Sequence, residues 1–270
     1  MTIWIDPPLW PAHGRLWSHL ISDDSLAELH EFAAAAGIPA RGFEGDHYDV
    51  PAERYTDLVA AGARETTGRD LLARLRGSGL RMSKRKGDRG IRRLLAASFP
   101  DGTRADVDLV ASAKEMPHER VFASMVFVGD AAGAHLVSWS ERRQEWSACG
   151  GWRDGTETPV ETAVRETAEE SGLVLDAAEL RPAGYERFRR DRDDPTSGPG
   201  LWVEGRDILQ VYATTLPAVA PGLAPEAPGH PVPEWVDDAE LLRRCGGAFW
   251  WPLAASVLGL ATPGRPGGYG

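Results

Sequence analysis

The chain has 270 residues, a formal net charge of −10 at pH 7, and 42% hydrophobic and 26% charged residues. This length exceeds the usual size of one domain, so the sequence predicts two domains with a soluble, globular composition. The acidic charge argues against general nucleic-acid binding, which depends on basic surface, and no stretch approaches the roughly 18 apolar residues of a membrane span.

The cysteines point to a reducing environment. Cys149 and Cys245 are too few for a disulfide scaffold, and their spacing is not that of metal ligands. The N-terminal residues MTIWIDPPLW lack the basic and apolar regions of a secretory signal. We therefore expect a cytoplasmic protein without a membrane partner.

Residues 1–80 alternate between short apolar runs and helical patterns. TIWID, SHLIS and ARGFEG are expected as strands, and Ser25 with Glu28 forms a capping box that opens a helix ending near Gly37. A second helix is expected from Pro51 to Ala61. This alternation predicts a small, mainly parallel α/β domain.

Residues 81–93, RMSKRKGDRGIRR, carry seven basic residues and one acidic residue. A charge run of this kind is usually a solvated segment between domains, and an arm that contacts phosphates is the alternative. We assign residues 81–118 to a basic linker and bridging segment.

A helix with an acidic side is expected within GWRDGTETPVETAVRETAEESGL. Residues three and four apart are neighbours on a helix, so Glu166, Glu169 and Glu170 share one sector. Their mutual repulsion needs compensation, which Arg165 supplies in part and a hard divalent cation could complete. A solvated acidic face would be the ordinary explanation of such a pattern taken alone.

The residues around these glutamates favour the metal site. Gly151, Glu157, Arg165, Glu166, Glu169, Glu170 and Gly172 match the pattern G-x5-E-x7-R-E-U-x-E-E-x-G-U, in which U is apolar and Thr167 is the one mildly polar departure. A chance match is on the order of one in 10⁸ per starting position. The segment resembles the signature of the Nudix hydrolase family.

The resemblance implies an α/β/α sandwich with a mixed sheet over residues 119–262, followed by a disordered tail at 263–270. It implies a divalent-metal-dependent pyrophosphohydrolase that cleaves a nucleoside diphosphate linked to another moiety, with Mg²⁺ as the cofactor and Mn²⁺ as the alternative. The expected catalytic residues are Glu166, Glu169, Glu170, Arg165 and Glu157, and the expected metal-site residues are the first three with Gly150.

Substrate recognition is less defined by the sequence. Arg153 could contact phosphates, Trp152 and Phe188 could stack on a base, and Glu204 or Glu226 could add a metal ligand from a downstream loop. A small-molecule nucleotide is the expected partner, and a homodimer is left open. The alternative function is a Nudix-fold sensor that binds a nucleotide metabolite and acts through the N-terminal domain.

The N-terminal domain has a candidate site of its own. Asp46, His47 and Asp49 follow a predicted strand, Asp6 closes another, and His19 lies in SHLIS, so a sheet could bring them together for metal binding or acid–base chemistry. Structural roles, such as capping by Asp49, are an equal alternative. Residues 2–80 resemble a small domain family of unknown function with this D-H-Y-D motif, which implies no activity.

Overall fold

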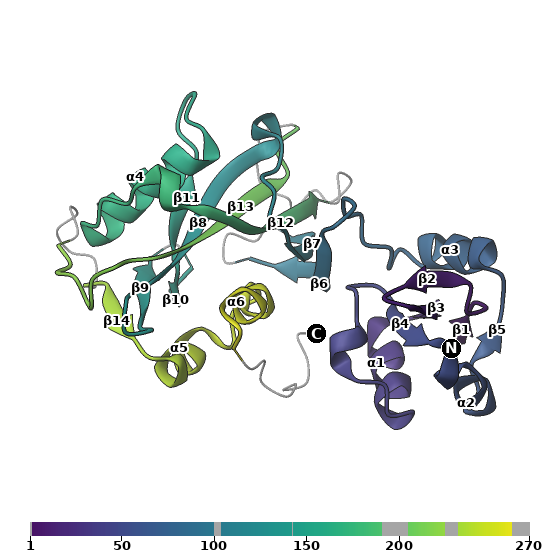
Figure 1. Ribbon diagram of the computed structural model, residues 1–270. Coiled ribbons are helices and arrows are strands. Elements are labelled where there is room, and N and C mark those ends of the chain that lie inside the picture. Colours follow the sequence, from purple (N-terminus) through teal and green to yellow (C-terminus); the bar gives the residue numbers. More distant parts are fainter. Residues whose placement is uncertain (1, 100–103, 142, 191–204, 225–231, 261–270) are drawn as a thin grey trace. The chain divides into compact units, whose positions relative to one another are not determined.

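The computed structural model describes residues 2–99, 104–141, 143–190, 205–224 and 232–260 (Figure 1). The chain divides into two compact units, Met1–Arg93 and Leu94–Gly270, and each is considered by itself. No helix among the described residues is both long and apolar enough to cross a membrane.

The first unit is built around a five-stranded sheet of order β2-β3-β1-β5, with β4 paired to β3. Its strands are β1 (Ile3–Ile5), β2 (Trp10–Ala12), β3 (Arg15–Ser22), β4 (Tyr48–Pro51) and β5 (Arg64–Glu65). Its helices are α1 (Leu26–Ala35), α2 (Tyr55–Ala60) and α3 (Gly68–Gly77). The α/β class of this unit is as expected from the sequence.

The expectation of a mainly parallel sheet in this unit is wrong. Strand β3 is antiparallel to β1, β2 and β4, and β1 with β5 is the parallel pair among the described strands. The cause is local, because His13 and Gly14 both have positive φ and close a two-residue hairpin between β2 and β3. ARGFEG, expected as a strand, begins instead with a 3-10 turn at Ala40–Gly42.

Helices cover both faces of this sheet. Ile3 and Ile5 pack into a core with Leu29 of α1 and Leu58 of α2. Trp4, which points the other way, packs with Leu71 and Leu75 of α3. Figure 1 shows α1 and α2 on one side of the strands and α3 on the other. The period-2 alternation along β1 therefore places the sheet between two helical layers.

The basic residues of 81–93 are paired within the first unit. Arg81 lies 3.1 Å from Asp46, Lys84 lies 3.0 Å from Glu44, and Arg85 lies 3.0 Å from Asp88. This differs from both the solvated segment and the phosphate arm considered from the sequence. Glu44 and Asp46 lie just before β4, far from this segment in sequence, whereas Asp88 lies within the segment itself.

The second unit contains a nine-stranded sheet of order β10-β9-β8-β13-β12-β7-β6, with β11 paired to β8 and β14 to β9. Its strands are β6 (Arg89–Ser98), β7 (Arg104–Ala111), β8 (Val121–Gly129), β9 (His135–Ser140), β10 (Glu145–Ser147), β11 (Cys149–Trp152), β12 (Arg181–Arg190), β13 (Ile208–Thr215) and β14 (Glu234–Val236). Its helices are α4 (Pro159–Ser171), α5 (Asp238–Cys245) and α6 (Trp251–Leu258).

Strands β6 and β7 lie in the segment that the sequence assigned to a basic linker and bridging segment. Strand β7 pairs antiparallel with β12 over seven positions, from Gly184 with Ala111 to Arg190 with Ala105. Val107, Leu109 and Val110 of β7 are fully buried. Besides connecting the two units, the segment therefore adds strands to the sheet. The apolar side chains of β7 become buried when β7 pairs with β12.

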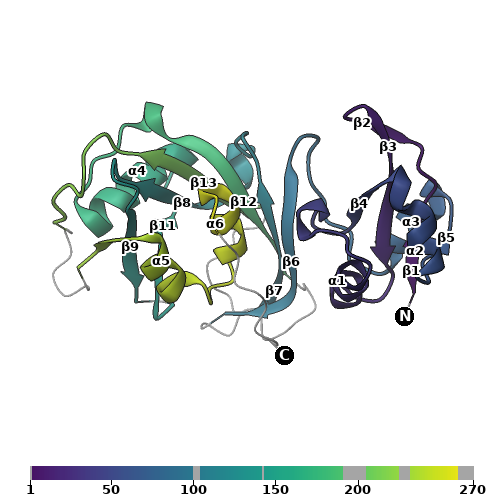
Figure 2. The ribbon, with the colours of Figure 1, turned by 60° about the horizontal axis from the view of Figure 1, so that its bottom comes forward.

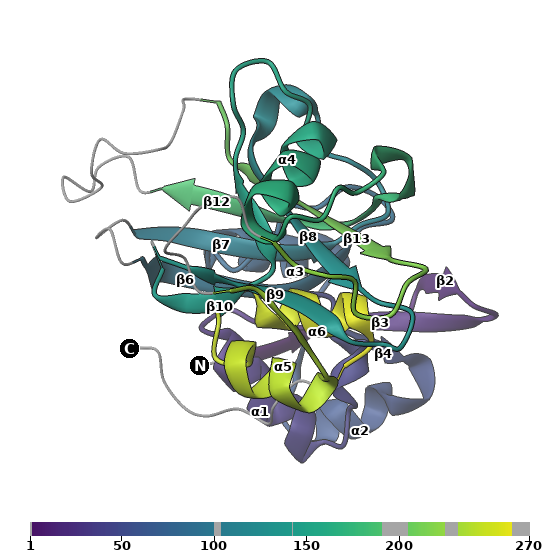
Figure 3. The same ribbon diagram turned by 90° about the vertical axis from the view of Figure 1, so that its left-hand side faces the viewer.

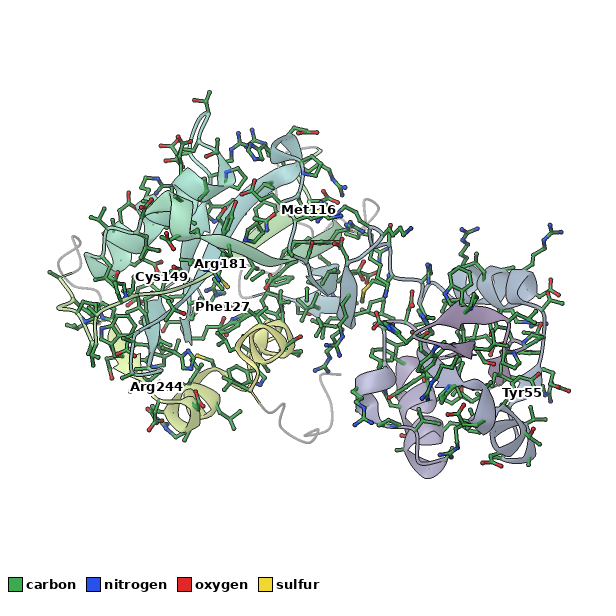
Figure 4. All side chains as sticks on the ribbon, in the orientation of Figure 1. Tyr55, Met116, Phe127, Cys149, Arg181 and Arg244 are labelled. Carbon is green, nitrogen blue, oxygen red and sulfur yellow. The ribbon has the colours of Figure 1, made fainter. Side chains whose placement is uncertain are left out.

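The sheet is mixed and lies between helices, as the sequence predicted for an α/β/α sandwich. Strands β8 and β13 are parallel, whereas β12 is antiparallel to both β7 and β13. Helix α4 covers one face, and α5 and α6 cover the other (Figures 1 and 2). Phe127 points toward α6 and contacts Trp250, with 6.1 Å between ring centroids (Figure 4).

The α6 layer supplies a direct test of this packing. Leu253 is fully buried, so Leu253→Ala should lower the free energy of unfolding by about 2–5 kcal/mol through lost burial and a residual cavity. Leu242→Ala on the outside of α5 should cost less than about 1 kcal/mol. Urea denaturation measures both values, and equal losses would contradict the assignment of α6 to the core.

Candidate active site

Helix α4 is fixed at both ends by its own sequence. Thr158 accepts a hydrogen bond from the amide of Glu161, the Glu161 side chain returns to the Thr158 amide, and Pro159 occupies the first turn. Gly172 ends the helix at φ 76°, and an added Cβ would lie 2.4 Å from the carbonyl oxygen of Ala224. The positions of the glutamates on this helix are therefore set within narrow limits.

Two glycines allow β11 to approach both the sheet and the helix. A Cβ on Gly150 would lie 2.3 Å from the carbonyl oxygen of Ser124 in β8. A Cβ on Gly151 would lie 2.4 Å from the carboxyl group of Glu166. Glu166 thus rests against bare backbone, and no other residue type at position 151 leaves that space.

Arg165 holds three of the signature glutamates. Its Nε donates to Glu157 Oε1 at 2.7 Å, and its Nη1 lies 3.0 Å from Glu166 Oε1 and 3.1 Å from Glu169 Oε2. Its Nη2 donates to the carbonyl oxygen of Trp152 at 2.8 Å. One guanidinium therefore ties the helix to the loop and to β11 while it offsets the repulsion among the carboxylates.

Glu157 is fixed as an anion on the loop before α4. The Arg165 hydrogen bond lowers the pKa of Glu157 to about 2, although burial opposes this shift. Thr162 Oγ1 and the amide of Asp154 also donate to Glu157 Oε2, at 3.0 and 3.1 Å. Glu157 is thus bonded to its own loop and to α4 at the same time, and it holds the Arg165 guanidinium in position.

Glu170 lies deeper than the other signature glutamates. Its Oε2 accepts hydrogen bonds from the Ser138 hydroxyl at 2.7 Å and the Gly150 amide at 3.3 Å. Burial raises the pKa of Glu170 to about 7, and the charge of Glu166 adds to that effect although the hydrogen bonds oppose it. Burial likewise raises the pKa of Glu166. Glu166 shares Arg165 with Glu157 and Glu169, whereas Glu170 has no ion pair with Lys or Arg among the described residues.

The donor set on this side of α4 fits a hard divalent cation. Glu166, Glu169 and Glu170 offer carboxylate oxygens, which Mg²⁺ and Mn²⁺ prefer, and the bare backbone of Gly151 leaves room for the Glu166 carboxyl. The Glu169 side chain is 46% exposed, so it can turn from Arg165 toward an ion. The oxygen atoms of these three carboxylates do not all lie within 4.8 Å of one another. Among the described residues, one group of three potential metal ligands lies that close together, and it is in the first unit.

Cys149 is buried next to Glu170 (Figure 4). Burial raises the pKa of the Cys149 thiol, and the charge of Glu170 adds to the effect. The thiol packs with Ala163 and Val126 in the core beneath α4. Cys149 therefore serves packing, and both cysteines are free.

The residues expected to bind substrate are placed in different ways. Trp152 stacks on Phe122 with 4.9 Å between centroids and stays partly exposed. Arg153 donates to the carbonyl oxygens of Glu157 and His118, so its guanidinium is bonded to the backbone of the chain. Glu204 and Glu226 lie outside the described residues.

Phe188 does not have the expected position. It is 6% exposed and packs against the rings of Phe122 and Phe249 in the core of the second unit. Stacking on a substrate base from this place is excluded without rearrangement of the core. Alternation along β12, which turns Phe188 toward the α6 layer, is the physical reason.

The five residues singled out in the N-terminal unit do come together. His19 Nδ1 lies 3.0 Å from Asp6 Oδ2, and His47 Nδ1 lies 2.5 Å from Asp46 Oδ1. Asp49 Oδ1 lies 3.3 Å from His47 Nε2 and 4.0 Å from His19 Nε2. The Nε2 atoms of His19 and His47 thus both face Asp49. The Nδ1 atom of His19 contacts Asp6, and that of His47 contacts Asp46.

Electrostatics in this cluster favour a cation at its centre. Burial would lower the pKa of His47, but its hydrogen bonds to Asp46 and Asp49 and their charges outweigh burial and raise the pKa to about 9. Burial would raise the pKa of Asp49, and the bond with His47 outweighs it and lowers the value. The His47 imidazole therefore carries a positive charge between the two carboxylates at pH 7.

Several residues that complete these sites have no recognisable signal in the sequence. Ser138 lies in a strand far from the signature, and nothing in HLVSWS marks it as a partner of Glu170. Arg81 stabilises the buried Asp46 from a segment that was interpreted as a linker. Contacts across long sequence separations carry no local pattern.

Glu186 is a further residue that sequence reasoning missed. It is 1% exposed in β12, and neither carboxyl oxygen has a hydrogen-bond partner among the described residues. Burial raises the pKa of Glu186 to about 8, with Arg143 lowering and Glu145 raising it by smaller amounts. Glu186 is therefore mostly neutral at pH 7 in the folded chain.

Comparisons with known proteins agree with this geometry. A family model described as the NUDIX domain matches residues 118–255, just over half of the chain, and one described as "Protein of unknown function (DUF4031)" matches residues 3–78. The α/β/α sandwich, in which the glutamates of α4 follow the glycine turn of β11, is the arrangement expected for the class of hydrolase that the sequence resembles. The chain belongs to the Nudix family, and its C-terminal unit carries the Nudix hydrolase domain.

The matching curated proteins share a short stretch with this chain, and the solved structures cover about half of it at low identity. A protein from two strains of Mycobacterium tuberculosis, provisionally named 8-oxo-dGTP diphosphatase 3, is 47% identical over 47 residues, which span 17% of this chain and 22% of that protein. A pyrophosphohydrolase from Bacillus subtilis is 17% identical over 53% of this chain and 77% of its own, with a TM-score of 0.36. The dihydroneopterin triphosphate pyrophosphohydrolase of E. coli is 16% identical over 52% and 99%, with a TM-score of 0.37. At these values neither structure extends an activity to this chain.

The glycine turn supplies one stability test. Gly150→Ala places a methyl group against the backbone of Ser124 and should lower the free energy of unfolding by about 1–3 kcal/mol or more. The matched control is Gly222→Ala, which meets no atom within 4 Å and should change that free energy by at most about 1 kcal/mol. Urea denaturation decides, and a neutral Gly150→Ala would mean that β11 does not lie this close to β8.

The buried carboxyl of Glu186 supplies a pH test. Its pKa is raised in the folded chain, so the wild type loses stability as pH rises from about 4 toward 8 while Glu186 is forced to ionise. Glu186→Gln removes this loss, and its advantage over the wild type should grow to a few kcal/mol by pH 9. Unfolding measured at pH 5, 7 and 9 tests this, and an advantage that stays constant with pH would contradict it.

Proposed function

We propose that the C-terminal unit is a Mg²⁺-dependent pyrophosphohydrolase that cleaves a nucleoside diphosphate linked to another moiety. The observation that carries the proposal is the complete signature around α4, with Arg165 contacting Glu157, Glu166 and Glu169 from one guanidinium. Carboxylates gathered on one side of a helix repel one another, and a bound divalent cation would offset the part of that repulsion that Arg165 does not.

Glu166, Glu169 and Glu170 would hold the ion, with the carbonyl group of Gly150 as the further candidate. A bound Mg²⁺ would neutralise charge on the diphosphate and lower the pKa of an attacking water. Glu169 is half-exposed and Glu170 is buried, so the two carboxyl groups lie in different environments on one helix. Either one could accept the proton of the water, and the assignment is left to mutagenesis.

Arg165 and Glu157 would act as positioning residues. Arg165 contacts Glu166 and Glu169 directly, and Glu157 holds its guanidinium in place at 2.7 Å. Ser138 would orient Glu170 through the 2.7 Å hydrogen bond to its carboxyl. These contacts restrict the rotamers of the candidate ligands before any substrate binds, which lowers the cost of assembling the site.

The substrate class follows from the same charges. A negatively charged diphosphate can approach an acidic helix when a divalent cation lies between them, so the ion and the substrate bind together. The name of the Mycobacterium tuberculosis relative adds 8-oxo-dGTP to the nucleotides worth testing. A sensor that binds without cleaving is the alternative, and the intact signature favours the enzyme.

The test is turnover of a panel of compounds with the full chain. ADP-ribose, nucleotide sugars, dinucleotides, coenzyme A, nucleoside triphosphates and 8-oxo-dGTP are incubated with Mg²⁺ or Mn²⁺, and products are identified by mass spectrometry. We expect cleavage of a phosphoanhydride bond in at least one compound. Glu170→Gln should lower kcat by roughly 100-fold or more without lowering stability.

Glu179→Gln is the matched control, because Glu179 is exposed and lies just after α4, away from the signature. It should leave kcat within about twofold. Tight binding of one compound without cleavage, unchanged in Glu170→Gln, would favour the sensor. Cleavage that persists in Glu170→Gln would remove this residue from the proposed site.

A further inference from the structure

We propose that the N-terminal unit binds one divalent transition-metal ion through His19 Nε2, His47 Nε2 and a carboxylate oxygen of Asp49. These donor atoms lie within 4.8 Å of one another, and no other three such residues in the described part of the chain do so. The proposal concerns a second site, and it is independent of the function proposed for the Nudix domain.

The distances suit an ion at the centre of the three donors. Asp49 Oδ1 is 3.3 Å from His47 Nε2 and 4.0 Å from His19 Nε2. Ligands at about 2.0–2.2 Å from Zn²⁺ in tetrahedral or octahedral geometry lie about 3 to 3.5 Å from each other. Only a small movement of His19 or Asp49 would complete the coordination.

Both imidazoles are oriented as metal ligands usually are. Asp6 accepts at Oδ1 from the His19 amide at 2.5 Å and contacts the His19 Nδ1 at Oδ2, at 3.0 Å. Asp46 is fully buried, contacts the His47 Nδ1, and accepts from the Met82 amide at 2.6 Å. A carboxylate behind each ring fixes the tautomer that leaves Nε2 free to coordinate.

The sheet holds the site rigidly. His19 in β3 and Asp49 in β4 are direct partners in the antiparallel register, so their side chains share one face. The amide of Asp6 donates to the carbonyl oxygen of His19 at 3.2 Å, which adds the end of β1. Three neighbouring strands therefore position the cluster, and the short turn after Gly45 brings in His47.

The segment 81–93 supports the same cluster from outside. Arg81 contacts the Asp46 carboxylate at 3.1 Å, and the Met82 amide binds it as well. Gly90 allows this segment to approach the turn, since a Cβ there would lie 2.5 Å from the carbonyl oxygen of Glu44. Asp46 has its oxygens occupied in this way, so it orients His47 and is not itself a ligand.

The ligand set points to the class of ion and to its accessibility. Two imidazoles and one carboxylate suit Zn²⁺, Fe²⁺ or Co²⁺ better than Mg²⁺ or Ca²⁺, which prefer oxygen donors. The side chains of Asp49 and His19 are 41% and 27% exposed, so the ion would face solvent on that side. Three protein ligands leave further coordination positions for water or an anionic ligand, as in catalytic sites.

The test uses the full chain with Glu166→Gln and Glu170→Gln, which disable the candidate metal site of the Nudix domain. After removal of metal by a chelator, Zn²⁺ and Co²⁺ are titrated by calorimetry, and the Co²⁺ complex is examined by its visible absorption. We expect one ion per chain and a Co²⁺ spectrum with nitrogen ligands. Asp6→Asn should weaken binding by about 10- to 100-fold, because it disturbs the orientation of His19.

His47→Ala and Asp49→Asn should each abolish this binding, and His13→Asn, at an exposed turn, should leave it unchanged. Circular dichroism verifies that each variant is folded, and if His47→Ala does not fold, the half-exposed Asp49 decides the test. The proposal is overturned if the chain binds no ion at micromolar concentration, or if binding persists in the Asp49 variant. In that event the cluster is a hydrogen-bonded network closed by a protonated His47.

Discussion

The guanidinium group of Arg165 is the interaction on which the Nudix site depends. It contacts Glu157, Glu166 and Glu169 and also the backbone of Trp152, so it joins the loop, the helix and β11. Removing it would leave several carboxylates facing each other in a partly buried place, where repulsion is stronger than in water. The glycines at 150 and 151 allow the backbone approach that this arrangement requires.

The site on α4 could be predicted from the sequence because its determinants are local. Thr158, Pro159 and Gly172 set the beginning and end of α4, which Figure 3 shows on the opposite side of the sheet from α5 and α6. Spacing alone then places Glu166, Glu169 and Glu170 on one side of this helix. The Nudix and N-terminal families were both identified correctly from such motifs. The α/β/α architecture of the C-terminal unit followed from the same resemblance.

The rest depended on contacts between distant parts of the chain. In the first unit the His13-Gly14 turn makes β2 and β3 antiparallel, and β3 also pairs antiparallel with β1 and β4, which the pattern of alternating elements did not reveal. The partners of Asp46 and Glu170, and the burial of Glu186 and Phe188, arise from strand pairing and sheet faces. Hydrophobic periodicity shows that a strand has a buried face but not which residues will cover it. The five N-terminal site residues were nevertheless named as a group from the sequence, although the strand expected before Asp46 begins with a 3-10 turn and Asp49 lies in β4.

The most direct test of the central claim is a crystal structure of the full chain grown with Mn²⁺, with anomalous differences measured near the manganese edge. The account predicts a peak beside the carboxylates of Glu166, Glu169 and Glu170, with Glu169 turned away from Arg165 and the contact between Arg165 and Glu157 intact. An unoccupied α4 at millimolar Mn²⁺, with Arg165 still holding Glu166 and Glu169, would contradict the claim that these carboxylates are gathered to bind a cation.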